Sequence, residues 1–488
     1  MLDTVEAVQL RHSRDTPARH KAALGQFFTP VSIARFMASL FEPAAARARL
    51  LDAGAGVGTL SAAFAEACAT LGIGQLQIDA HERDPAVHDA LARNLSAASA
   101  HVPRQFSITG GDFVETAVNR IQFGAAPRYT HVILNPPYKK IHGASAQRLL
   151  MRQVGLETVN LYAAFVGLSL ELLEPGGQLV AIVPRSFCSG PYYRPFRRWL
   201  FERAALRRIH LFDSRVSAFK QDAVLQENVI IALRRGAAQG AVVVSHATDD
   251  AFADLVAAEF PFERVVSRDA DQVIHVPGPA AQPAADARPR PGHTLAALGI
   301  EVSTGPVVDF RQKEHLCRQP EPGAVPLLYP GHFSAAGLIW PRPDYKKPNA
   351  IRVNAQTQRW LYPAGSYTVV RRLSSKEERR RVVAGVVDAR AFPGVEQLGF
   401  ENHLNVFHQN KRGLPLMLAH GLAAYLNSTI VDEAFRSFNG HTQVNASDLR
   451  RLDYPSLADL QTLGSWAAGF DAPPAQDAVD ARLEGWLR

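Results

Sequence analysis

The residues Asn135-Pro136-Pro137-Tyr138 carry the most distinctive chemistry in this sequence. They follow Val132-Ile133-Leu134, whose β-branched and leucyl side chains predict a buried strand. The two prolines end that strand, because neither can donate to a ladder and each restricts the residue before it. We therefore expect Asn135 and Tyr138 on a rigid loop at the carboxyl end of a strand, where open α/β sheets bind ligands.

The groups on this loop suit an aromatic amine as the reacting partner. The Asn135 side-chain oxygen accepts hydrogen bonds, and we expect the Pro136 carbonyl to point into the same space. Two acceptors can hold both hydrogens of an NH2 group and leave its nitrogen lone pair facing outwards. The Tyr138 ring adds a flat face on which a planar ring could stack. The alternative is a strand-end turn with a buried tyrosine.

A glycine-rich loop lies upstream, in Leu50–Leu60, where the pattern predicts a strand, a loop and a helix. Gly54, Gly56 and Gly58 let the backbone approach a ligand closely. Their Gly-x-Gly-x-Gly spacing differs from the Gly-x-Gly-x-x-Gly of dinucleotide-binding folds. The loop therefore suits a nucleoside that lacks a pyrophosphate.

The segment Gly25-Gln26-Phe27-Phe28-Thr29-Pro30 predicts the start of a helix. Thr29 is a favourable N-cap and Pro30 a favourable first helical residue. The free N–H groups at a helix start suit a carboxylate, such as that of a methionyl group. The alternative is a capped helix that binds no ligand.

Two acidic residues are placed by predicted strands. Glu82 ends a second strand, Leu76–Glu82, and a carboxylate there can hold both hydroxyls of a ribose. Asp112 follows a third strand, Gln105–Gly110, and could accept a hydrogen bond from an adenine amine while Phe113 flanks the ring. The alternatives are a turn carboxylate and a core phenylalanine.

Further strands are predicted at Gly177–Pro184, Arg208–Phe212 and Asn228–Leu233. Strands alternate with helices until the last two strands, which follow one another directly. This order predicts a mostly parallel sheet with an antiparallel edge.

The composition is that of a globular intracellular protein. With 488 residues the chain is long enough for two or three domains, and its net charge of +7 suits a polyanionic partner. The three cysteines are far apart, which excludes a disulfide framework and a thiolate zinc site. The histidines show no metal-ligand spacing, and no signal core or membrane span is present. We expect a cytoplasmic protein without a metal site.

The second half contains many short strand-like runs and several basic clusters after a Pro- and Ala-rich connection that begins near Val276. Aromatic residues lie among these clusters, and the resemblance described below, which implies a DNA substrate for the first half, favours phosphate contacts and some base contacts to DNA here. The alternative is that most of these charges are solvated surface groups. The residues that we expect to contact DNA are Arg311, Arg371, Arg372, Lys411 and Arg412.

In their order, these blocks resemble the catalytic domain of gamma-class DNA adenine-N6 amino-methyltransferases, in particular the Eco57I-like restriction-modification methylase group. The resemblance covers roughly residues 22–235. It implies an α/β fold, with a Rossmann-like AdoMet-dependent methyltransferase domain on a seven-stranded mixed sheet and a C-terminal mixed α+β target-recognition domain. The expected boundaries are 1–240 for the catalytic domain, 241–292 for an appendage and connection, and 293–488 for the target-recognition domain.

The resemblance also implies roles for individual residues. Asn135, Pro136 and Tyr138 would hold the target base. Phe219 is the best placed candidate for a second aromatic that pinches the flipped base, with a core aromatic as the alternative. The sequence departs from many members of the group by Phe28 in place of tyrosine, which puts any hydroxyl role there in doubt. The residues that would contact the methyl donor, S-adenosyl-L-methionine (AdoMet), are Phe27, Thr29, Asp52, Gly54, Gly56, Glu82, Asp112 and Phe113.

The implied activity is methyl transfer from AdoMet to N6 of an adenine flipped out of double-stranded DNA, as the modification component of a restriction-modification system. No metal is required for it. A separate cognate restriction endonuclease is left open as a partner. The alternatives are an AdoMet-dependent methyltransferase that acts on RNA or cytosine N4, and a catalytically inactive DNA-specificity subunit.

Overall fold

The chain forms two compact units, Met1–Ala285 (unit 1) and Asp286–Arg488 (unit 2), in a computed structural model. The division falls inside the expected connection, and the finer domain boundaries at 240 and 292 stay predictions. Phe27 and Phe219 lie outside the described residues, so their expected roles also stay predictions. The structure describes residues 2–15, 28–43, 46–97, 104–124, 128–212, 227–278, 292–375, 377–440 and 442–487.

Unit 1 is built on one mixed sheet, whose strand order is β3-β2-β1-β4-β5-β7-β6-β8-β9 in the described part of the chain. Strands β1 to β5 are parallel, and β7 lies antiparallel between β5 and β6. The order reverses between β1 and β4, which makes their carboxyl ends the switch point of the sheet. The strands are β1 Arg47–Ala53, β2 Gln75–His81, β3 Arg104–Thr109, β4 Tyr129–Leu134, β5 Leu173–Pro184, β6 Ala204–Phe212, β7 Asn228–Arg235, β8 Val242–Ala247 and β9 Val256–Phe260.

The predicted α/β class and mixed sheet are confirmed, but the predicted count of seven strands is wrong. A hairpin of β8 and β9 extends the sheet beyond β6, with β8 parallel to β6 and β9 antiparallel to β8. Residues 242–260 therefore continue the sheet of unit 1, because the apolar run Val242–Val244 finds a paired edge there.

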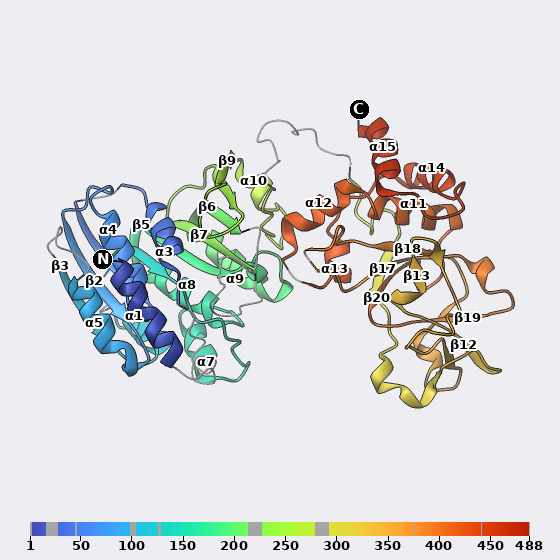
Figure 1. Cartoon of the computed structure of the whole chain (residues 1–488), viewed down its shortest axis with the longest axis horizontal. Coiled ribbons are helices and arrows are strands. Elements are labelled where there is room, and N and C mark those ends of the chain that lie inside the picture. Colours follow the sequence, from blue (N-terminus) through green and yellow to red (C-terminus); the bar gives the residue numbers. More distant parts are fainter. Residues whose placement is uncertain are drawn as a thin grey trace. The chain divides into compact units, whose positions relative to one another are not determined.

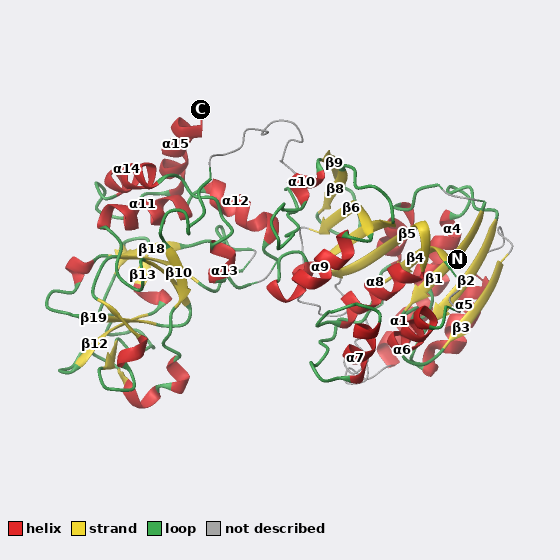
Figure 2. Cartoon of the chain, turned by 180° about the vertical axis from the view of Figure 1, so that it is seen from behind, coloured by secondary structure: helices red, strands yellow, loops and turns green. Residues whose placement is uncertain are grey.

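Helices cover both faces of this sheet, as the two opposite views show (Figure 1 and Figure 2). Alternate strand residues such as Ile133 and Leu134 face opposite cores, which explains why the strands are apolar on both sides. One core contains residues of α1 Leu2–Asp15, α3 Val31–Ser39, α4 Thr59–Ala67 and α5 His88–Ala97. The other contains residues of α6 Phe113–Gln122, α7 Ala146–Gln153, α8 Leu161–Leu172, α9 Arg194–Phe201 and the short α10 Phe262–Val265.

The start of α3 differs from its prediction. The helix begins at Val31, Pro30 is the residue before it, and no side chain caps this end. Thr29 therefore does not act as the N-cap, and its hydroxyl takes another partner, described below. Pro30 has φ −55° and ψ 146°, which is an extended conformation, so the helical backbone begins one residue later than it would with a proline as the first helical residue.

Unit 2 consists of small sheets followed by helices. Its largest sheets have the orders β11-β15-β12-β19-β16 and β10-β20-β17-β18. The strands are β10 Glu301–Thr304, β11 Leu316–Cys317, β12 Ala324–Leu328, β13 Phe333–Ser334, β14 Gly337–Leu338, β15 Ala350–Arg352, β16 Leu361–Pro363, β17 Tyr367–Arg371, β18 Ala384–Val387, β19 Gln397–Phe400 and β20 Leu404–His408. The helices are α11 Leu416–Leu426, α12 Thr429–Phe438, α13 Ala446–Leu449, α14 Leu457–Ala467 and α15 Gln476–Leu487.

The helices of unit 2 pack closely where glycines face each other. A Cβ atom on Gly421 of α11 would lie 1.8 Å from the Leu460 carbonyl oxygen, and one on Gly464 of α14 would lie 1.7 Å from the Met417 oxygen. Any larger residue at these two positions would separate α11 from α14.

No helix within the described ranges is long and apolar enough to cross a membrane.

Candidate active site

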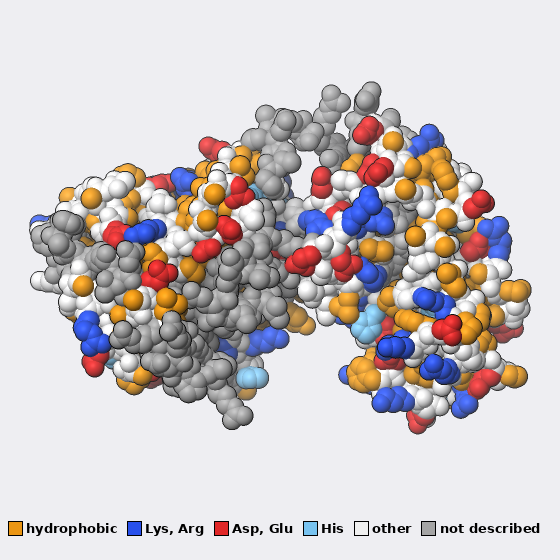
Figure 3. Space-filling view, in the orientation of Figure 1, with side chains coloured by type: hydrophobic (Ala, Val, Ile, Leu, Met, Phe, Trp, Pro, Cys, Tyr) orange, Lys and Arg blue, Asp and Glu red, His pale blue; other side chains and the backbone are white. Residues whose placement is uncertain are grey.

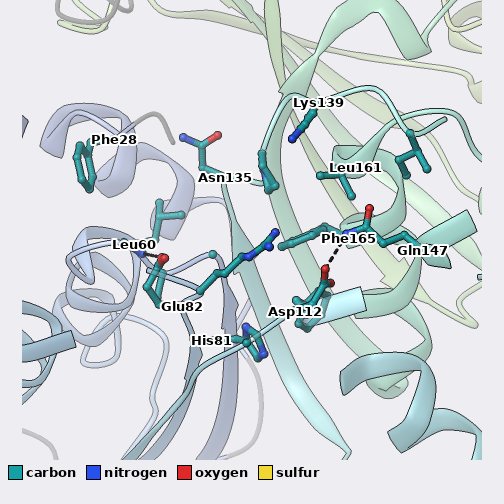
Figure 4. A pocket seen from close by; sticks show the side chains of 18 of the residues that line it. Phe28, Leu60, His81, Glu82, Asp112, Asn135, Lys139, Gln147, Leu161 and Phe165 are labelled. Carbon is teal, nitrogen blue, oxygen red and sulfur yellow. Dashed lines mark hydrogen bonds between the residues drawn. The ribbon is translucent and has the colours of Figure 1, made fainter. Parts of the chain in front are cut away.

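A cavity of about 400 Å³ opens at the switch point of the sheet, at the carboxyl ends of β1 and β4 (Figure 4). The glycine loop leaves β1 at this point, and the loop that begins with Asn135 leaves β4. Parallel neighbours bring both loops to the same edge, as the sequence predicts. Of the residues expected to contact ligand or target base, those that line the cavity are Thr29, Gly54, Gly56, Glu82, Asp112, Phe113 and Asn135.

The glycine loop has a backbone that other residues would strain. Gly54, Gly56 and Gly58 have φ values of 85°, 53° and 88°. A Cβ atom on Gly56 would also lie 3.1 Å from the Phe28 ring, which lines the same cavity. The Phe28 ring therefore packs against Gly56, and both residues line the cavity.

Glu82 holds the glycine loop from the end of β2. The backbone N–H groups of Gly56 and Asp84 donate to its two carboxylate oxygens at 2.7 and 2.8 Å. The side chain is buried, and this burial raises the pKa of the Glu82 carboxyl above its ordinary value. The carboxylate thus faces the cavity already oriented, with lone pairs remaining for further donors.

Asp112 is a helix cap and Phe113 a core residue, and both also line the cavity. Asp112 caps α6, because its Oδ1 accepts from the Val114 N–H at 2.9 Å. Its Oδ2 accepts from Nε2 of Gln147 at 2.6 Å. Phe113 is buried in the core and still lines the cavity, with its ring centroid 4.7 Å from that of Phe165. This end of the cavity is an apolar slot with a carboxylate beside it.

Asn135 is fixed by a residue that lies far away in the chain. Its Nδ2 donates to Oγ1 of Thr29 at 3.1 Å, just before α3 begins. The amide oxygen is the only acceptor of this side chain, and it points away from the nitrogen that bonds to Thr29. Figure 4 shows Asn135 at the cavity between Phe28 and Lys139.

Pro136 and Tyr138 lie outside the lining of the cavity. The Tyr138 hydroxyl donates to the Ile182 carbonyl of β5 at 3.3 Å, and the ring makes an edge contact with Tyr162. Burial raises the pKa of the Tyr138 phenol well above its ordinary value, so the hydroxyl stays protonated. Tyr138, the last residue of the loop, is therefore anchored to β5 and does not line the cavity.

Asp52 also lies outside the lining, although it was expected to contact AdoMet. It is fully buried at the end of β1, where the Ser61 hydroxyl of α4 donates to its Oδ2 at 2.6 Å. Within the described residues, its Oδ1 has no hydrogen-bond partner. Burial raises the pKa of Asp52 from 3.8 to about 7. In this structure Asp52 joins strand and helix below the loop.

Other lining residues were not found from the sequence. His81 is buried beside Phe113, and within the described part of the chain its Nε2 has no hydrogen-bond partner. Burial lowers the pKa of His81 to about 4, so the ring is neutral. Gln147 and Phe165 lie on helices without any local motif. The cations Lys139 and Lys140 follow the Tyr138 motif directly, and that adjacency could have identified them.

Some of the cations expected to contact DNA already bond to other groups of unit 2, and others are exposed. Arg371 pairs with Glu378, and Arg372 donates to the Asn402 carbonyl at 3.2 Å. Lys411 and Arg412 are exposed on a tight turn after β20, and Arg311 is exposed beside the Phe310 ring. On the face in Figure 3, Lys and Arg side chains gather on unit 2 over the part drawn yellow in Figure 1.

The basic run Arg379-Arg380-Arg381 includes a residue that points inward. Arg381 is 1% exposed, donates to Ser374 and Asn439, and lies over the Phe435 ring. It belongs to the interior of unit 2.

Across the described ranges, no three His, Cys, Asp or Glu side chains come together in a way that could hold a metal ion.

Comparisons with known proteins agree on one family. Residues 89–219 match the model of the Eco57I restriction-modification methylase family. The whole chain is 45% identical to 98% of Type II methyltransferase M.BsuBI of Bacillus subtilis. Over 91% of its length it is 40% identical to 89% of Type II methyltransferase M.PstI of Providencia stuartii. In fold, 96% of the chain resembles 59% of a chain in a DrdV–DNA complex, with a TM-score of 0.54 and 12% identity.

Proposed function

For this chain, which belongs to the Eco57I-like family of Type II restriction-modification methyltransferases, we propose transfer of a methyl group from AdoMet to N6 of adenine in double-stranded DNA. The observation that carries the proposal is the Asn135 amide, held by Thr29 at the wall of a cavity that the glycine loop shares. An amide acceptor placed beside a nucleoside site suits an exocyclic amine as the group that reacts.

The residues of the cavity fit AdoMet. A volume of about 400 Å³ is in the range of pockets for ligands of this size. The glycine loop lines the cavity without side chains at Gly54 and Gly56, and Glu82 offers carboxylate oxygens for two ribose hydroxyls. The apolar slot of Phe113 and Phe165 suits the adenine ring, with Asp112 as acceptor for its amine. The buried Nε2 of His81, described above, is a polar group that a purine nitrogen can satisfy.

When bound, AdoMet supplies an electrophilic methyl group on a sulfonium. The protein holds the amine that accepts it. Oδ1 of Asn135 and the Pro136 carbonyl accept the two hydrogens of the adenine 6-amine, which favours the positive charge that develops on N6. Thr29 holds the Asn135 amide before the reaction, so its oxygen needs no reorganisation during it. The surplus proton leaves N6 for water after transfer, and no strong base is required.

An adenine within a duplex cannot reach this cavity, so the base must rotate out of the helix at a cost of roughly a few kcal/mol. The Tyr138 ring, anchored on β5, supplies a face for the extruded base next to Asn135. Exposed cations of unit 2, including Arg311, Lys411 and Arg412, bind the phosphates of the duplex. A separate endonuclease that cleaves the unmethylated site would complete the restriction-modification system.

The experiment that tests this proposal offers labelled AdoMet to the protein with unmethylated plasmid DNA, RNA and a protein mixture as competing acceptors. We expect label on the double-stranded DNA alone. Label on RNA or on protein would replace the proposed substrate class. Binding of DNA without any transfer would leave the chain as a DNA-specificity subunit.

A further inference from the structure

The segment 139–160, which follows the Asn135-to-Tyr138 loop, forms a closed excursion at the edge of the cavity. The Ile141 N–H donates to the Val159 carbonyl, and the Leu161 N–H donates to the Lys139 carbonyl, both at 2.8 Å. The excursion carries α7, which packs against α6. It thus joins the target-base loop to the helix that Asp112 caps.

One side chain of the excursion enters the cavity and bonds to Asp112. Gln147, in the first turn of α7, donates from Nε2 to Oδ2 of Asp112 at 2.6 Å, as Figure 4 shows. The other oxygen, Oδ1, is committed to the Val114 N–H. The two bonds fix the rotation of the carboxylate about its own axis, because each oxygen is held by a different element.

A carboxylate held in this way can still accept a further donor, because each oxygen has two lone pairs. Asp112 lines the same cavity as Phe113 and Phe165, so a purine ring that packs against these two rings would lie beside the carboxylate. A 6-amino group there would donate to Oδ2, whereas a 6-oxo group would place an oxygen against the carboxylate. The orientation of Asp112 therefore decides which purine the slot accepts.

We propose that Gln147 is a positioning residue that aims Asp112 at the 6-amino group of the methyl donor and so sets the preference for an adenosyl over an inosyl ligand. This inference rests on the proposed function, because it takes the slot as the AdoMet site. Gln147 acts through Asp112, so its loss weakens discrimination between purines more than it weakens folding.

The competing interpretation is that Gln147 only fastens α7 to α6. The chain offers a matched control for this, because the far end of the same two helices carries a second such bond. Nε2 of Gln122 in α6 donates to Oε1 of Gln153 in α7 at 3.0 Å, and Gln153 does not line the cavity. A fastening role predicts the same effect from both bonds, whereas a positioning role predicts an effect from Gln147 alone.

The test compares the wild-type protein with Gln147→Leu and Gln153→Leu by calorimetric binding of S-adenosylhomocysteine and S-inosylhomocysteine. We expect wild type and Gln153→Leu to prefer the adenosyl ligand to the same extent. In Gln147→Leu the preference should fall by about tenfold, the size expected for a misplaced hydrogen bond to a charged group. Gln147→Asn, which keeps the amide but is shorter by one methylene, should show the same loss if Gln147→Leu fails to fold.

An unchanged preference in both Gln147 variants would overturn the inference and leave the proposed function standing. An equal loss in Gln147→Leu and Gln153→Leu would assign both bonds to helix packing and would also overturn it. If the wild-type protein binds neither ligand, the proposed function itself fails and this inference fails with it.

Discussion

The amide nitrogen of Asn135 donates a hydrogen bond to the hydroxyl of Thr29 at 3.1 Å, which joins the loop after β4 to the segment before α3. The two residues are 106 positions apart in the chain. The bond holds the amide by its nitrogen, so the oxygen is presented in one fixed direction. In the proposed reaction, Thr29 therefore acts on the target base through Asn135.

Replacement of Thr29 by valine tests this relationship, because it removes the hydroxyl and keeps the shape. We expect the single-turnover rate of methyl transfer to fall by about fivefold, as the loss of one hydrogen bond worth roughly 1 kcal/mol predicts. The dissociation constant of AdoMet should change much less. Thr29→Ser keeps the hydroxyl and should retain most of the rate. A Thr29→Val protein that transfers at the wild-type rate would show that the bond has no part in the reaction.

The raised pKa of the Glu82 carboxyl predicts that the affinity for AdoMet depends on pH. Burial raises the pKa of its carboxyl, so protonation begins at a higher pH than for an exposed glutamate. The protonated form is a poorer acceptor for the ribose hydroxyls, so the affinity for AdoMet should fall as the pH is lowered through this raised pKa. Glu82→Gln should bind about tenfold more weakly at neutral pH and should lose this part of the pH dependence. Calorimetry across the acidic range measures both effects.

The raised pKa of Asp52 predicts that the free energy of unfolding depends on pH. Between 3.8 and about 7, the folded protein keeps a proton on Asp52 that the unfolded chain releases. The free energy of unfolding therefore falls as the pH rises through this range. The asparagine of an Asp52→Asn variant does not titrate, so from about pH 5 to about pH 8 its thermal midpoint should rise relative to wild type, by roughly 2 °C or more. A difference in midpoint that is constant with pH would assign Asp52 an ordinary pKa.

Lys411 and Arg412 predict part of the salt dependence of DNA binding, because both are exposed on the turn after β20. If each neutralises one phosphate, the double variant Lys411→Ala/Arg412→Ala should reduce the slope of log affinity against log salt by about two. Arg390→Ala is the matched control, since that exposed arginine already pairs with Asp388. Equal slopes for wild type and the double variant would remove this turn from the DNA surface.

Features that depend on neighbouring residues were predicted from the sequence. The strand that ends at Asn135, the glycine loop and the acidic ends of β2 and β3 each have a local pattern, and parallel pairing brings them to one edge. The family resemblance was confirmed by the full-length relatives. The start of α3 was predicted one residue too early, because the backbone at Pro30 is extended.

Features that depend on tertiary packing were not predicted. His81, Gln147 and Phe165 enter the cavity because of where their elements pack, and none of them belongs to a motif. The sequence likewise does not indicate the burial of Arg381, because its interior partner Asn439 lies in a distant segment.

The most direct measurement is nucleoside analysis, by chromatography and mass spectrometry, of unmethylated plasmid DNA treated with the protein and AdoMet. The account predicts N6-methyladenine from the wild-type protein, and a rate lower by about 10²–10³-fold from Asn135→Ala, with AdoMet binding retained. N4-methylcytosine as the product, or N6-methyladenine formed by Asn135→Ala at the wild-type rate, would contradict it.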